Sequence, residues 1–142
     1  MKEIRDGNKH TNSHWTTFTE TKQILLVDFD HTITKKCLAC KDGLKGDGVQ
    51  EGAKETLTKL SKDFQIWIYT GNYDLLKEIK IPIKRTVKAI GEFLKKNNIP
   101  FDKILQTKPP AMFIIDDRAI HHEGWIGEKS TLKKIEKRMK TV

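Results

Sequence analysis

The sequence predicts an α/β fold, a single domain in which helices cover both faces of a parallel sheet in three layers. Short and mainly apolar runs at residues 24–27, 64–69 and 112–115 predict strands. Longer segments with apolar residues at helical spacing, 50–61 and 84–97, separate these runs. Strands that alternate with helices in this way are typical of parallel sheets buried on both faces.

The first half of the core contains two strands and one helix. The run 23–29 is apolar until its last residues, and it predicts a fully buried strand. A loop of residues 33–48, rich in Lys and Gly, follows. Ala53, Leu57 and Leu60 then share one face of a helix over 50–61. Residues 64–69 are rich in aromatic and β-branched side chains and predict the second strand.

The second half repeats the alternation. A short helix over 73–80 stops before Pro82, and a longer helix over 84–97 has Val87, Ile90 and Leu94 on one face. Short strands at 103–106 and 112–115 follow. A helix over 129–140 with a basic outer face ends the chain.

Length and composition are typical of a small soluble domain. The chain has 142 residues, which favours one domain. Residues 1–22 lack periodicity, so we expect a partly ordered N-terminal extension, held by Trp15 and Phe18, before a core domain of residues 23–142. No apolar run is long enough to span a membrane, and the N-terminus lacks the apolar core of a signal peptide, so we expect a cytoplasmic protein.

The net charge of +8 is compatible with an anionic partner, such as a phosphorylated substrate, nucleic acid or acidic protein. The lysines are spread along the chain, which favours solvated helix faces and gives no specific indication of nucleic acid. Cys37 and Cys40 form one Cys-x-x-Cys pair in the 33–48 loop. Reduced thiols are the preferred interpretation; a metal site completed by histidines and a redox pair remain open.

Two carboxylates, Asp28 and Asp30, stand at the end of the first strand, with Thr32 two residues further on. Ligands of open α/β sheets bind at the carboxyl ends of the strands. Closely spaced carboxylates repel one another unless a cation lies between them, and Mg²⁺ prefers such oxygen ligands. A carboxylate can also act as a nucleophile on phosphorus. Two solvated aspartates at a strand end are the alternative interpretation.

Further polar residues follow the later strands. Thr70 and Gly71 come after the strand 64–69, Lys108 lies in a loop, and Asp116 and Asp117 follow the strand 112–115. In a parallel sheet these positions converge on the edge that carries Asp28 and Asp30. A lysine and a hydroxyl among carboxylates favour the binding of a phosphate together with a cation.

This pattern resembles the haloacid dehalogenase (HAD) superfamily of phosphohydrolases. Asp28-Phe-Asp30-His-Thr32 is similar to its first motif, Asp-x-Asp-x-Thr, and Asp116-Asp117 is similar to its fourth. Thr70 and Lys108 stand in the order of its second and third motifs, which are weak alone. The likeness covers roughly residues 23–125 and implies a HAD-like Rossmannoid core.

The resemblance implies a Mg²⁺-dependent phosphatase with an aspartyl-phosphate intermediate. Asp28 would be the nucleophile and Asp30 the general acid and then base. Thr70, Gly71 and Lys108 would bind the phosphoryl group, with Thr70 and Lys108 counted as catalytic.

The resemblance also implies a metal site. Mg²⁺ would be held by Asp28, by the backbone carbonyl of Asp30 and by the Asp116–Asp117 pair. Of this pair, Asp117 is expected to be the more direct ligand and Asp116 to bond Lys108 or a water on the metal.

HAD enzymes often carry a cap domain, but the segments between these motifs are too short for one, so we expect a capless enzyme. An open site suits a bulky phosphorylated substrate, or a small one covered by a neighbouring subunit. His121, His122 and Trp125 are candidates for the rim of the site, although Trp125 is equally compatible with ordinary packing.

Three alternatives to a phosphatase remain open. A receiver-like phosphoacceptor also uses acidic residues, a Thr and a Lys, but it places its adjacent aspartates first, whereas this chain has Asp116-Asp117 last. A non-catalytic module on the same fold would use the positive charge to bind nucleic acid or acidic protein. A different reaction on this fold, phosphoryl transfer or dehalogenation, is a further possibility, and Asp30 favours phosphate chemistry.

Overall fold

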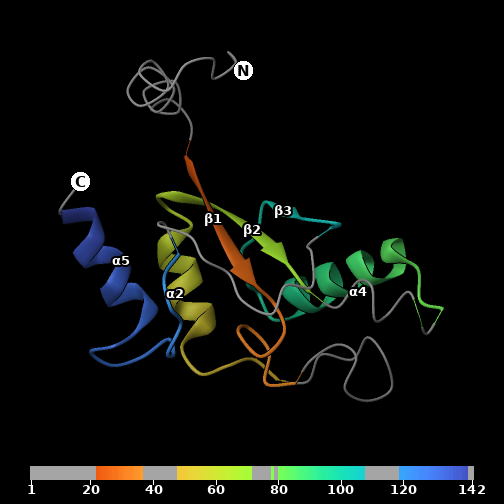
Figure 1. Ribbon diagram of the computed structural model, residues 1–142, viewed down its shortest axis with the longest axis horizontal. Helices are drawn as coiled ribbons and strands as arrows, with labels where there is room; N and C mark the ends of the chain where they lie inside the picture. The colour runs from red at the N-terminus through yellow and green to blue at the C-terminus, as the bar shows by residue number, and fades with distance from the viewer. Residues whose placement is uncertain (1–21, 37–47, 72–77, 79, 108–118, 141–142) are drawn as a thin grey trace, which may run out of the picture.

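The computed structural model describes residues 22–36, 48–71, 78, 80–107 and 119–140. Figure 1 shows three strands and three helices in these ranges. They are, in chain order, β1 (Gln23–Asp28), α2 (Ala53–Leu60), β2 (Phe64–Tyr69), α4 (Ile83–Lys96), β3 (Lys103–Ile104) and α5 (Thr131–Lys140).

The three strands form one parallel sheet in the order β1-β2-β3. The register pairs Gln23 with Phe64 and continues to Asp28 with Tyr69. β1 and β2 therefore end side by side, and whatever follows them meets at one edge. The prediction of parallel strands is confirmed for these three.

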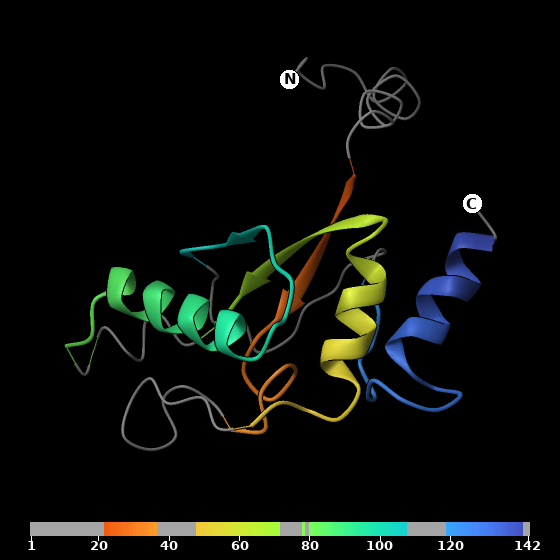
Figure 2. The ribbon, with the colours of Figure 1, turned by 180° about the vertical axis from the view of Figure 1, so that it is seen from behind.

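Helices α2 and α4 flank the strands in Figures 1 and 2, and both contribute to one core. Their buried residues join a single apolar cluster with those of β2. α4 buries Thr86, Ile90 and Leu94, and α2 buries a face that includes Leu57 and Leu60. The predicted α/β class is therefore confirmed.

Apolar side chains from the strands and the helices fill the core. Phe64, Ile66 and Ile68 alternate along β2 as buried residues. The expectation that the first strand is fully buried is wrong, because Ile24 is 41% and Leu26 is 57% exposed. Ile24 and Leu26 lie on the face of β1 opposite to Val27, and only the face that carries Val27 packs on the core.

Several observed bounds differ from the predicted ones, and local contacts explain the starts of α2 and α5. α2 begins at Ala53 because Gly52, with φ +83°, interrupts the helical backbone. α5 begins at Thr131 because the Ser130 hydroxyl accepts a hydrogen bond from the Lys133 amide (3.3 Å) as a helix cap. β3 is only two residues long.

The ends of the predicted loop 33–48 pair with each other. Thr34 and Val49 form an antiparallel bridge, and the Gln50 amide donates to the Ile33 carbonyl (2.8 Å). This pairing holds the segment before α2 against the turn after β1.

Several predictions fall outside the described residues. They are the extension before Lys22 with Trp15 and Phe18, the pair Cys37 and Cys40, most of the helix 73–80, and the strand 112–115. None of the helices in the described ranges combines the length and the apolar character needed to cross a membrane.

Candidate functional site

The turn after β1 is built around Phe29. Its backbone carbonyl accepts amides from Thr32 (3.3 Å), Ile33 (2.9 Å) and Thr34 (3.2 Å). Its side chain is fully buried and meets the Phe93 ring edge-on, with 5.4 Å between the ring centroids. Phe29 thus fixes the backbone between Asp28 and Asp30, whose side chains are half-buried.

The parallel register brings the end of β2 to this turn. Tyr69 pairs with Asp28, and its carbonyl accepts the Phe29 amide (2.9 Å). Thr70 follows Tyr69, is fully buried, and donates a hydrogen bond through Oγ1 to Asp30 Oδ2. The structure therefore brings Asp30 and Thr70 into direct contact, with Gly71 next in the chain.

Asp28 also has described partners at this edge. Thr32 Oγ1 donates to Asp28 Oδ2 (3.0 Å), so Thr32 braces the turn and this carboxylate together. Burial raises the pKa of Tyr69, and the negative charge of Asp28 raises it further. The Asp28 carboxylate thus acts on its surroundings as a local negative charge.

The remaining predicted site residues, Lys108, Asp116 and Asp117, lie outside the described residues. Within the described ranges, no group of three or more His, Cys, Asp or Glu side chains could hold a metal ion. The carboxylates of Asp28 and Asp30 supply oxygen donors, the type that Mg²⁺ prefers.

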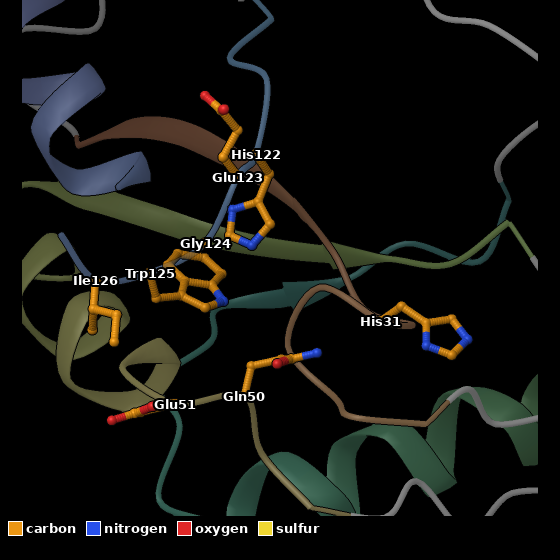
Figure 3. A pocket seen from close by; sticks show the side chains of 8 residues that line it. All are labelled: His31, Gln50, Glu51, His122, Glu123, Gly124, Trp125 and Ile126. Carbon is orange, nitrogen blue, oxygen red and sulfur yellow. The ribbon is translucent and has the colours of Figure 1, made fainter. Parts of the chain in front are cut away.

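A pocket of about 390 Å³ lies beside the turn (Figure 3). Three segments line it: His31 after β1, Gln50 and Glu51 before α2, and residues 122–126 before α5. Gln50 Nε2 donates to the Thr34 carbonyl (3.2 Å), which ties the second segment to the turn. The volume is in the range of small-molecule sites.

Trp125 ties the third segment to the same turn. Its indole Nε1 donates to the Thr32 carbonyl (2.8 Å), and its own carbonyl accepts from Thr56 Oγ1 of α2 (3.4 Å). Gly52 leaves room for it, since a Cβ there would lie 3.1 Å from Trp125 Cβ and 2.6 Å from Ile126 Cγ2. The pocket wall is therefore fixed by backbone contacts from two sides.

His122 packs on this wall. Its ring lies 4.6 Å from the Trp125 ring, centroid to centroid, and its Nδ1 is 2.6 Å from Thr131 Oγ1. Burial lowers the pKa of His122, and the charges of Lys134 and His121 lower it further, whereas the charge of Asp28 opposes the shift. The influence of Asp28 places the His122 ring within electrostatic reach of the acidic turn.

Sequence reasoning found part of this pocket. His122 and Trp125 line the pocket, and His121 does not. Their expected place at the rim of the site around Asp28 stays a prediction. Gln50 and Glu51 were missed, because two polar residues before a helix carry no distinctive pattern. Their position depends on the pairing between Gln50 and Ile33, which the sequence alone does not reveal.

Comparisons with known proteins give one structural relative and no functional identity. No protein-family model and no curated protein matches the chain. A crystal structure from Vibrio cholerae, named only as a structural target, is similar with a TM-score of 0.54 and 29% sequence identity. The match covers 69% of this chain and 82% of the other. This likeness supports the α/β fold, and the name of the relative states no activity.

Proposed function

We propose that the protein is a Mg²⁺-dependent phosphomonoester hydrolase of the HAD type, with a HAD-like core and no separate cap domain. The contact between Thr70 and Asp30 carries the proposal. It joins the first and second motif positions, which are 40 residues apart, at the carboxyl end of two parallel strands. This is the edge at which α/β sheets bind ligands.

In this mechanism Asp28 attacks the phosphorus atom. The bond to the leaving oxygen breaks as the bond to the Asp28 carboxylate forms, which gives an aspartyl-phosphate. The hydrogen bond from Thr32 Oγ1 to Asp28 Oδ2 restrains the rotation of this carboxylate.

Asp30 moves the protons. It donates a proton to the leaving oxygen in the first step and then accepts one from the water that hydrolyses the aspartyl-phosphate. Thr70 orients the Asp30 carboxyl group, because its hydroxyl donates a hydrogen bond to Oδ2. A hydroxyl has a single proton to donate, so Thr70 cannot hold Asp30 and a phosphoryl oxygen with that proton at the same time.

The carboxylates fit a hard cation in donor type. Mg²⁺ would be held by Asp28, the Asp30 backbone and Asp117 with its neighbour Asp116, and it would neutralise charge on the phosphoryl group. Lys108 would add a second positive charge there. Replacement of Asp117 by Asn is expected to weaken Mg²⁺ binding, which calorimetry measures without any substrate.

Release of inorganic phosphate from a broad phosphoester panel, with and without Mg²⁺, tests the proposal. Wild type is compared with Asp28→Asn, which keeps the shape of the side chain and removes the nucleophile. Mg²⁺-dependent turnover that disappears in Asp28→Asn supports a phosphatase. Absence of turnover combined with salt-sensitive binding of nucleic acid would instead favour a non-catalytic module.

A further inference from the structure

The pocket lies next to the β1 turn that connects Asp28 to Thr34. His31 belongs to this turn, and Trp125 hydrogen-bonds the carbonyl of Thr32, whose hydroxyl holds Asp28. The charge of Asp28 also influences His122. The two hydrogen bonds of Thr32 therefore link the pocket wall at Trp125 to the Asp28 carboxylate.

The inner surface of the pocket offers hydrogen-bonding groups from three segments of the chain. Figure 3 shows Gln50 and His31 across from the rings of His122 and Trp125. With its Nδ1 against Thr131, His122 directs its other ring nitrogen toward the pocket. Gln50 uses Nε2 toward the Thr34 carbonyl, and its amide oxygen is a further acceptor. An imidazole, an amide and an indole ring suit hydroxyl groups on a partly apolar skeleton.

The charges around the pocket disfavour a second anion. The described residues that line it include no lysine or arginine, and two of them, Glu51 and Glu123, are carboxylates. The Lys134 ammonium near His122 pairs with Glu123. The depressed pKa of His122 keeps its ring neutral at pH 7. This local balance contrasts with the overall net charge of +8.

We propose that this pocket receives the alcohol part of the phosphomonoester and selects an uncharged, polyhydroxylated alcohol over one that carries a further negative charge. The inference rests on the proposed hydrolase function and adds the substrate class. Phosphorylated sugars and sugar alcohols have the required chemistry, whereas phosphorylated acids and bisphosphates do not.

A matched pair of substrates tests the selectivity. Glucitol 6-phosphate and gluconate 6-phosphate differ only in a terminal hydroxymethyl or carboxylate group, and p-nitrophenyl phosphate reports the basal activity. We expect wild type to favour glucitol 6-phosphate in kcat/KM by about fivefold, the equivalent of a repulsion of about 1 kcal/mol from the exposed Glu51 carboxylate.

Two variants with matched controls connect the selectivity to the pocket. Glu51→Lys places a cation at the rim of the pocket and is expected to lower the preference for glucitol 6-phosphate over gluconate 6-phosphate by about three- to fivefold. Glu55→Lys makes the same charge change on α2 outside the pocket, and it should leave this preference unchanged. His122→Phe is expected to raise KM for glucitol 6-phosphate several-fold, and His121→Phe to leave it unchanged.

The outcomes separate the two proposals. Equal turnover of both sugar derivatives would overturn the pocket assignment, and so would identical effects of Glu51→Lys and Glu55→Lys. In either case, hydrolysis of p-nitrophenyl phosphate would still support the proposed hydrolase function. Preference for the gluconate would overturn it as well. Absence of turnover on all three substrates would overturn the hydrolase function, and the pocket assignment with it.

Discussion

Replacement of Thr70 by valine removes one buried hydroxyl and little else. Thr70 is fully buried, and its Oγ1 donates to Asp30 Oδ2. Valine keeps the branched shape, so the substitution leaves the volume almost unchanged while Asp30 loses this donor. We expect a loss of activity that exceeds any loss of stability.

The expected size follows from the hydrogen bond. A bond to a charged group contributes about 1.5–3 kcal/mol, which corresponds to a loss of about 10- to 150-fold in kcat/KM if Asp30 acts in the rate-limiting step. Stability should change by only about 1 kcal/mol, because the half-buried carboxylate retains access to water. Thr70→Ser retains the hydroxyl and should keep most of the activity.

Phosphate release with Mg²⁺ and urea unfolding measure the two effects separately. Thr86→Val is the matched control, since Thr86 is also fully buried but its hydroxyl bonds the Pro82 carbonyl (3.3 Å) in α4. Full activity in Thr70→Val, or an equal loss in Thr86→Val, would refute the role assigned to Thr70.

Three other substitutions test the packing and electrostatics of the pocket. Gly52→Ala should destabilise the fold by about 1–3 kcal/mol, because of its positive φ and the clash of the new Cβ with Ile126. Gly91→Ala, in ordinary contact inside α4, should stabilise it by about 0.5–1 kcal/mol, and urea unfolding compares the two variants. Trp125→Phe removes the indole donor from a loop carbonyl and should cost about 1–3 kcal/mol by the same assay. Lys134→Met should raise the pKa of His122, measured by NMR titration, because the ammonium charge lowers it.

Each of these predictions has a contradicting outcome. Equal changes in the free energy of unfolding for the two glycine variants would show that neither the positive φ of Gly52 nor its close contacts with Trp125 and Ile126 affect stability. A Trp125→Phe protein as stable as wild type would show that the indole hydrogen bond to the Thr32 carbonyl does not stabilise the fold. An unchanged His122 titration would contradict the electrostatic influence of Lys134, and Lys133→Met, on the same helix, is the control for a general charge effect.

The pKa of His122 also predicts a dependence of stability on pH. A histidine whose pKa is lower in the folded state binds fewer protons there than in the unfolded chain. The free energy of unfolding should therefore fall as the pH decreases from 6.5, the ordinary pKa of a histidine, toward the lower pKa of His122 in the folded protein. His122→Asn should reduce this fall, which urea unfolding at several pH values measures.

The sequence predicts the elements of this fold well because their patterns are local. The strand 64–69 appears with the predicted bounds, since its alternating large side chains bury Phe64, Ile66 and Ile68 on one side. The helix 84–97 is displaced by one residue. By contrast, the exposure of Leu26 depends on which face of β1 packs on the core, which hydropathy alone does not determine.

The site is predictable in its residue types and less so in its contacts. Asp28, Asp30 and Thr70 stand out because they follow apolar strands. That Thr70 bonds Asp30 depends on the register between β1 and β2. The pocket unites segments near residues 31, 50 and 122, and only tertiary packing brings such distant segments together.

Trapping of a covalent phosphoryl group on Asp28 tests the central claim most directly. Wild type is mixed with a ³²P-labelled phosphomonoester and Mg²⁺, quenched in acid within milliseconds, and digested to locate the label. If Asp28 is the nucleophile, the label should lie on the peptide that contains Asp28, and the Asp28→Asn protein should carry none. Turnover without label on this peptide, or equal turnover by Asp28→Asn, would contradict this role.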